Sequence, residues 1–205
     1  MLDVNDALSE IASIRGQMAR SSEFRGYGPT THAITGALAL AVAAGETLWA
    51  PRPGQALPLF LTLWIGTAVI ALTLIGAETV VRSRRLHTVL SLQMMHSAVE
   101  QFLPAIVAGG LLTLVLLRVA PESAWMLPGL WQLLFSLGVF ASCRFLPRAT
   151  FWVGVWYLCA GLACLGLGHG AWAFSAWEMG IPFGVGQLMV AAVLRFGLPD
   201  DHEPA

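Results

Sequence analysis

Six apolar stretches of about 20 residues follow one another along the chain, and they constrain its fold more than any other feature. A helix of that length rises 1.5 Å per residue and covers the roughly 30 Å of hydrocarbon in a bilayer. Only 11% of the residues are charged and 57% are hydrophobic, whereas about 25% of a soluble domain is charged. The sequence therefore predicts an all-α, polytopic transmembrane helix bundle.

The expected transmembrane domain covers residues 30–197 and holds six spans. Short breaks rich in proline, such as Pro51-Arg52-Pro53, separate several spans, so successive spans should be antiparallel neighbours. An acidic cytoplasmic tail, residues 198–205, follows the last one. The predicted spans are 31–50, 57–81, 102–119, 125–145, 149–168 and 177–196.

Residues 1–29 have a different pattern, because single apolar residues recur every three to four positions between polar ones. This pattern is typical of an amphipathic helix, followed here by a turn rich in glycine and proline. We expect the helix to lie on the cytoplasmic surface or to dock on a partner. Its apolar face would consist of Val4, Leu8, Ile11, Ile14 and Met18.

Arginine supplies all eleven basic residues, and its distribution predicts the orientation. Basic residues favour the cytoplasmic side of short loops. Nine arginines fall on one side of the predicted spans, and only Arg52 and Arg118 fall on the other. Both termini are therefore expected in the cytoplasm. No basic stripe runs along the sequence, so nucleic acid is not an expected partner.

An internal similarity suggests three related helical hairpins. Residues 128–134 and 183–189 share a glycine, then a glutamine and a leucine at the same spacing. The spans before them share a looser motif, Ala108-Gly-Gly-Leu111 and Cys159-Ala-Gly-Leu162, and Ile34-Thr-Gly-Ala37 resembles both. Chance similarity between helices rich in glycine and leucine is the alternative.

Two glutamines inside these spans are the strongest candidates for ligand binding. Gln132 follows Pro128 and Gln187 follows Pro182, and a proline within a helix leaves a carbonyl without its usual donor. Each amide either bridges such a carbonyl or lines a solute path, as paired interruptions in repeats do in transporters. Glu178 and Glu46 lie near the outer boundary, where they either join the path or face water.

The stretch from Arg82 to Glu100 is too polar to span but has helical periodicity. His96 and Glu100 are one turn apart in it, a geometry in which a carboxylate can orient an imidazole for proton handling or metal binding. Too few further ligands are near for a metal site to be expected, and a polar seam at the cytoplasmic boundary is the alternative. Glu78, four residues before Arg82, predicts an ion pair.

The first span carries small residues at every fourth position, Ala33, Ala37, Ala41 and Gly45. Such a face lets another helix approach closely. The neighbour is either another span of this chain or a second copy.

Catalytic motifs are missing from the sequence: there is no GxSxG and no HExxH, and no Walker loop or GxGxxG stands in a fitting context. No catalytic residue, metal or cofactor is therefore assigned. We expect a non-enzymatic accessory or regulatory membrane protein that packs against another protein or forms a homo-oligomer. A small-solute or ion transporter is the alternative, and an intramembrane enzyme the second alternative.

The segment from Ile11 to Gly36, with Met-Ala-Arg-Ser-Ser at 18–22 and Phe-Arg-Gly-Tyr-Gly-Pro at 24–29, resembles the start of small, uncharacterised bacterial multi-span membrane proteins. The resemblance extends to 128–134 and 180–188. It implies a location in the bacterial inner membrane, and it carries over no activity, cofactor or site residue.

Overall fold

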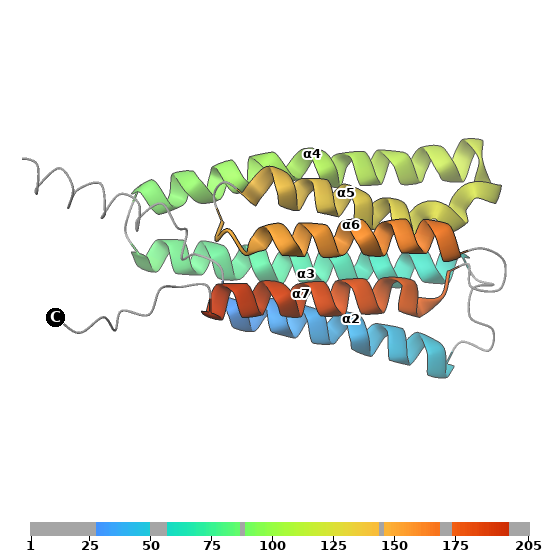
Figure 1. The fold of residues 1–205 in the computed structure, drawn as a ribbon, viewed down its shortest axis with the longest axis horizontal. Helices are drawn as coiled ribbons and strands as arrows, with labels where there is room; N and C mark the ends of the chain where they lie inside the picture. Colours follow the sequence, from blue (N-terminus) through green and yellow to red (C-terminus); the bar gives the residue numbers. More distant parts are fainter. Residues whose placement is uncertain (1–27, 50–56, 87–88, 144–145, 169–173, 197–205) are drawn as a thin grey trace, which may run out of the picture.

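The computed structural model describes residues 28–49, 57–86, 89–143, 146–168 and 174–196, with side chains left undescribed at 82–96 and 98. The expected amphipathic helix at 1–29 and acidic tail at 198–205 lie outside these residues. The described part is all-helical, as predicted. Its helices are α2 (Pro29–Trp49), α3 (Leu57–Leu86), α4 (Val89–Val119), the 3₁₀ helix η1 (Pro121–Met126), α5 (Leu127–Ser142), α6 (Thr150–Leu167) and α7 (Ala176–Phe196) (Figure 1).

Five stretches of these helices are long and apolar enough to cross a membrane, which indicates a multi-pass membrane protein. They are Leu57–Val81, Val99–Val119, Pro121–Ser142, Thr150–Leu167 and Ala176–Phe196. The helix α2, predicted as the first span, is less apolar because it carries His32, Thr35 and Glu46. All three side chains are buried within the bundle.

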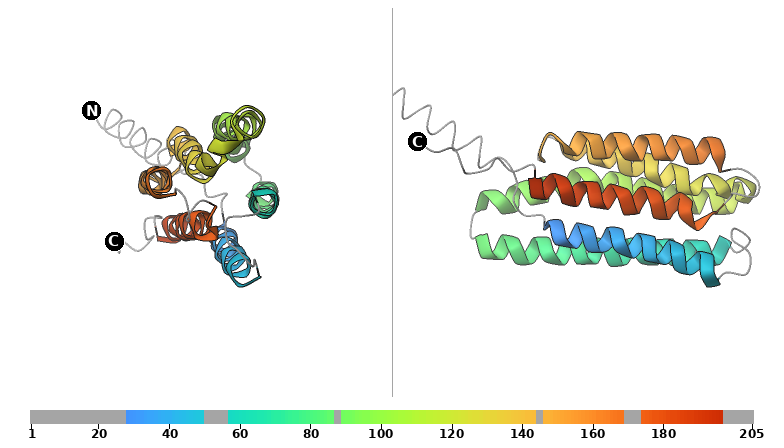
Figure 2. Two further views of the ribbon diagram at one scale, coloured as in Figure 1. Left: turned by 90° about the vertical axis from the view of Figure 1, so that its right-hand side faces the viewer. Right: turned by 60° about the horizontal axis from the view of Figure 1, so that its bottom comes forward.

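Successive helices run antiparallel, and the pairs in closest contact are α2 with α7 and α5 with α6 (Figure 1). Seen end-on, α5 lies between α4 and α6, α7 lies next to α6 and α2, and α3 stands at the edge between α4 and α2 (Figure 2). The last helix of the chain therefore packs on the first described one.

The polar stretch that follows the predicted second span is not a separate helix. The helix α3 continues to Leu86 over 30 residues, and α4 begins at Val89 and is 31 residues long. A span needs only about 20 residues, and both helices extend beyond the neighbouring helix ends (Figure 2). The hairpin α3–α4 therefore projects past the bundle at the end that carries Arg82, Arg84 and Arg85.

Glycines bring the two closest helix pairs together. A Cβ on Gly161 of α6 would lie 2.8 Å from the carbonyl oxygen of Gly129 in α5. A Cβ on Gly36 of α2 would lie 2.9 Å from the carbonyl oxygen of Gly184 in α7. The glycines at matching positions of the proposed repeats thus occupy matching places in two helix pairs, where only a hydrogen side chain allows this approach.

The small-residue face predicted on α2 is turned away from the bundle. Ala37 and Ala41 are exposed, and a Cβ on Gly45 would have no atom within 4 Å. The buried face lies on the other side of the helix and contains His32, Thr35, Gly36, Ala39, Ala43 and Glu46. This face packs on α7 because Ala43 leaves room for the backbone of Gly180, whose Cβ would overlap the Ala43 methyl. Another span of the described chain is therefore not the neighbour of the small-residue face.

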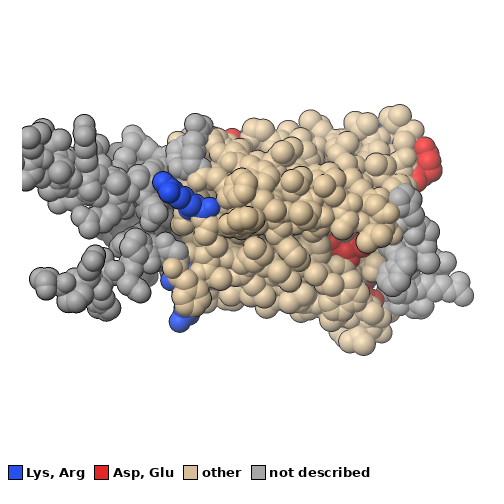
Figure 3. Space-filling view, viewed as in Figure 1, with Lys and Arg blue, Asp and Glu red and all other residues tan. Residues whose placement is uncertain are grey.

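On the visible face, the described arginine side chains lie at one end of the bundle, and the acidic side chains lie mainly toward the other end (Figure 3). Arg148 precedes α6 and Arg195 lies in the last turn of α7, which places both at one end. Glu122 lies in η1 at the opposite end. The long surface between the two ends is apolar, as expected for a lipid-facing surface.

Candidate functional site

Gln132 lies at the centre of the bundle with no exposed surface. Its Nε2 donates a hydrogen bond of 2.7 Å to the backbone oxygen of Glu178 in α7. That oxygen lacks its usual donor because Pro182, four residues later, has no N–H. Gln132 of α5 therefore satisfies the carbonyl that the proline of α7 leaves free. Gln187, on the same helix as the proline, does not serve this role.

Pro128, the proline paired with Gln132 in the repeat, leaves no such carbonyl. It lies in the first turn of α5, where the backbone N–H has no intrahelical acceptor and proline is readily accommodated. The expectation that each glutamine compensates for the proline of its own repeat is therefore wrong. Pro182 lies inside α7, whereas Pro128 lies in the first turn of α5.

Cys164 of α6 borders the same carbonyl. Its Sγ lies 3.5 Å from Nε2 of Gln132 and 3.6 Å from the oxygen of Glu178. A second donor reaches α7 one turn further along, where Nε1 of Trp156 donates a 2.9 Å hydrogen bond to the oxygen of Pro182. The interrupted segment of α7 is thus hydrogen-bonded to both α5 and α6.

Gln187 connects α7 to α2. Its Oε1 lies 2.7 Å from Nδ1 of His32 and 3.5 Å from Oγ1 of Thr35. Because an amide oxygen only accepts, Nδ1 of His32 carries the proton in this arrangement. Both ring and amide are 8% exposed. His32 is therefore a buried partner of Gln187.

Tyr157 of α6 lies next to this group and is completely buried among the rings of Phe135 and Phe183. Its hydroxyl touches Gly186, where a Cβ would lie 2.4 Å away. Gln187 is a polar neighbour, yet no hydrogen bond joins the hydroxyl to any group. The tyrosine fills the space that Gly186 leaves open.

Glu46 does not face water. It is 9% exposed, and Nε1 of Trp64 in α3 donates a 3.2 Å hydrogen bond to its Oε2. Trp64 and Phe60 are the buried residues by which the first half of α3 joins α2 and α7. The carboxylate therefore fastens α3 to the bundle.

Glu178 lies in the first turn of α7 and is partly exposed. Its Oε1 lies against Gly168, the residue that ends α6, and its Oε2 is buried without a hydrogen-bond partner. Glu178 contacts α6 whereas Glu46 contacts α3. The two carboxylates predicted at the outer boundary thus belong to different contacts.

The remaining predictions fall at the other end. His96 and Glu100 both lie on α4; Glu100 is exposed, and the side chain of His96 is outside the described residues. The carboxylate of Glu78 lies against Gly28 at the start of α2, while the side chain of Arg82 is not described. Among the described side chains, no group of three histidines, cysteines or acids is close enough to hold a metal ion.

The hydrogen bonds of α7 described above form two groups: one joins α7 to both α5 and α6, and the other joins α7 to α2. Sequence reasoning missed His32, Thr35, Tyr157 and Trp156 as members of this network. One signal was available: His32, Thr35, Ala39, Ala43 and Glu46 recur at three and four residues, so the polar side chains of α2 share one face.

Comparisons with known proteins add no relative, since no family model, no curated protein and no solved structure matches the chain.

Proposed function

We propose that the chain is a non-enzymatic accessory membrane protein that binds a transmembrane helix of a partner membrane protein along α2. The observation that carries this proposal is the small-residue face of α2, defined by Ala33, Ala37, Ala41 and Gly45. Its residues are spaced four apart, and the bundle leaves Ala37 and Ala41 exposed. In a bilayer, helices associate where small residues let backbones approach, because lipid and apolar side chains are alike in polarity.

The hydrogen bonds of the two candidate amides also support an accessory role. Gln132 and Gln187, the candidates for a solute path, are bonded to Glu178 and His32 and have little or no exposed surface. An amide that lines a path needs free hydrogen-bonding capacity toward the solute. The expected amphipathic N-terminal helix directly precedes α2 and would enlarge a binding surface there.

Cross-linking from single positions tests the proposal. Benzoylphenylalanine placed at Ile34 or Leu48, two large exposed residues of α2 beside the small-residue face, should yield one discrete, heavier adduct after irradiation in native membranes. The same residue at Leu162, which is 56% exposed on α6, is the matched control and should yield none. Adducts of equal intensity from all three positions, or from none, would reject binding along α2.

Bulky substitutions supply an independent test of the same face. Ala37→Leu and Ala41→Leu together should abolish the adduct captured from Ile34. Ala163→Leu, on an exposed face of α6, should leave it unchanged. A double variant that still cross-links as the parent does would show that the small side chains are not needed.

Transport of a small solute or ion is the second candidate. It is favoured by two buried oxygens without partners, the hydroxyl of Tyr157 and Oε2 of Glu178. Purification in mild detergent separates the candidates, because a partner polypeptide in fixed stoichiometry supports the first and a bound solute supports the second.

We also propose that the chain lies in the bacterial inner membrane with both termini in the cytoplasm, on the nine-to-two distribution of arginine. In a cysteine-free background, Pro53→Cys, Glu122→Cys and Ala173→Cys should react with an impermeant maleimide added to intact cells. Ser83→Cys should react only after lysis. The reverse pattern would invert the proposed orientation.

A further inference from the structure

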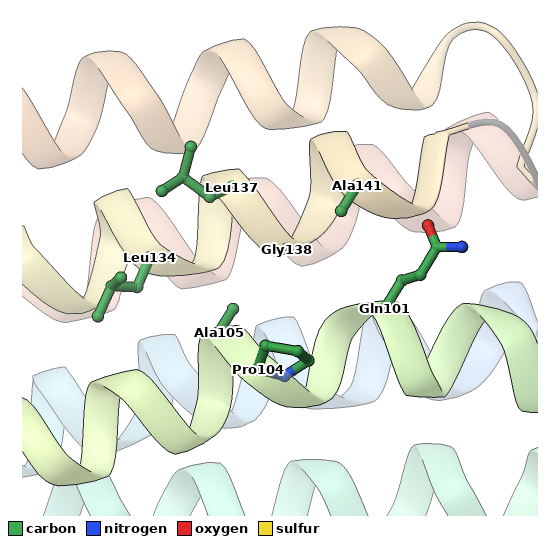
Figure 4. A pocket seen from close by; sticks show the side chains of 7 residues that line it. All are labelled: Gln101, Pro104, Ala105, Leu134, Leu137, Gly138 and Ala141. Carbon is green, nitrogen blue, oxygen red and sulfur yellow. The ribbon is translucent and has the colours of Figure 1, made fainter.

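A groove lies between α4 and α5 on the lipid-facing surface, with a volume of about 250 Å³. Its lining is Gln101, Pro104, Ala105, Leu134, Leu137, Gly138 and Ala141 (Figure 4). Pro104 interrupts the hydrogen bonding of α4 at this level, and the small residues Ala105, Gly138 and Ala141 leave the space open. We propose that this groove binds one acyl chain of a glycerophospholipid.

The position of the groove specifies a hydrocarbon occupant. Its lining belongs to Val99–Val119 and Pro121–Ser142, two of the stretches apolar enough to cross a membrane. At that depth no water is available to fill the groove. If the groove stayed empty, the side chains that line it would lose dispersion contacts. Six of the seven lining residues carry no polar side chain, so a saturated or unsaturated chain meets only matching surface.

The dimensions exclude a partner helix as the occupant. A helix with its side chains is about 10 Å across, whereas the groove is narrow enough that Gly138, at its floor, lies in contact with the ring of Phe102. A Cβ there would be 2.7 Å from that ring and 3.2 Å from the methyl of Ala105. A polymethylene chain, which has no branches, is the membrane component that fits.

The polarity of the groove ends specifies how the lipid lies. Gln101 is at one end, beyond Ala141, and Leu134 is at the other (Figure 4). The Gln101 end is the one at which Arg148 precedes α6 and Arg195 closes α7. An amide at the level of the glycerol esters and arginines at the level of the phosphate match a glycerophospholipid whose chain runs from Gln101 toward Leu134.

Native mass spectrometry of the full chain, extracted in mild detergent, tests the proposal. The wild type should retain one phospholipid per chain at a collision energy that removes loosely attached lipid. Ala141→Leu fills the groove, and we expect retention to fall by about tenfold or more. Ala108→Leu makes the same change on an exposed part of α4 and should retain lipid as the wild type does.

If Ala141→Leu fails to fold, Ala141→Val replaces it in the test, because valine adds less volume. Lipid retention by Ala141→Val should lie between that of the wild type and that of Ala141→Leu. A thermal melt of each variant in the same detergent shows which chains are folded. Equal retention by wild type and folded groove-filling variants would overturn the proposal, and it would identify the lipid as a general coat. A retained free fatty acid in place of a phospholipid would overturn the headgroup assignment.

Discussion

The helices α2, α5, α6 and α7 differ from the hairpin α3–α4 in how they are held. In α5, α6 and α7, 44%, 28% and 33% of the residues in the most apolar window are buried, against 17% in α3 and 6% in α4. The less buried helices are also the more apolar ones, since the mean hydropathy is 2.2 in the windows of α3 and α4 and 1.4, 1.7 and 1.5 in those of α5, α6 and α7. Hydrophobicity places a helix in the bilayer but does not attach it to a neighbour.

Polar contacts and glycine contacts account for the difference. The helices α2, α5, α6 and α7 contain the hydrogen bonds of Gln132 and Gln187. They also contain the glycines that approach a backbone carbonyl across the pairs α5–α6 and α2–α7. In α3, by contrast, the hydroxyls of Thr67 and Thr73 bond to carbonyls of their own helix. A Cβ on Gly66 or Gly76 would meet no atom within 4 Å. The helix α3 thus depends on few contacts, chiefly those of Phe60 and Trp64 near its start, whereas α4 packs on α5.

Adding side chains to matched glycines gives the largest expected contrast. Gly161→Val forces a side chain against the carbonyl of Gly129 at 2.8 Å and should destabilise the fold by about 3 kcal/mol or more. Gly76→Val, in open surroundings on α3, should change stability by less than about 0.5 kcal/mol. Unfolding in mixed micelles with a denaturing detergent measures both. Similar losses at the two sites would show that the hairpin is as tightly packed as the core.

A double-mutant cycle sharpens the role of Gln132. Gln132→Leu leaves the oxygen of Glu178 with only the weak thiol donor of Cys164 and should cost about 1–2 kcal/mol. In a Pro182→Ala background, residue 182 regains the N–H that bonds this oxygen, so the same substitution should cost much less. The free energy of unfolding of all four proteins measures the coupling. Additive effects would mean that the glutamine stabilises the bundle by another contact.

Gln187→Leu removes the acceptor of His32 and should cost about 0.6–1.7 kcal/mol, the range of side-chain hydrogen bonds between membrane helices. Its effect should add to that of Gln132→Leu, because the two amides bond different groups on different helices. Gln187→Glu keeps an acceptor and is the matched control. If a leucine variant at either position keeps full stability, the hydrogen bond of that amide does not stabilise the bundle. If such a variant is stable but loses the physiological effect of the protein, the result favours transport.

The smallest effect is expected where the hairpin joins the core. Nε1 of Trp131 donates a 2.8 Å hydrogen bond to the hydroxyl of Thr113 in α4, and that hydroxyl also bonds within its own helix to Gly109. Thr113→Val should therefore cost about 0.6 kcal/mol, measured as above against Thr73→Val as control. A loss as large as that of Gln132→Leu would contradict the division into a tightly held core and a loosely held hairpin.

Much of the architecture could be predicted from the sequence, because the requirement for apolar helices of a given length is local. The helices appear where the apolar stretches are, and the polar stretch after residue 81 is helical as its periodicity indicates. Its continuity with α3 was not predicted, since charge argues against a span but not against a helix that leaves the membrane. Gln132 and Gln187 were selected as candidates because polar groups in apolar spans are few.

The partners of those residues depended on tertiary structure. Nothing in the sequence says that Gln132 meets the carbonyl freed by Pro182 on another helix, since that contact joins positions 46 residues apart. Which face of α2 packs within the bundle was also left open, because small residues favour close approach to a span of the same chain and to a second copy equally. Composition and period determined that this chain forms membrane-spanning helices. Which faces meet was decided by packing and hydrogen-bond satisfaction between helices, and these depend on the positions of all helices together.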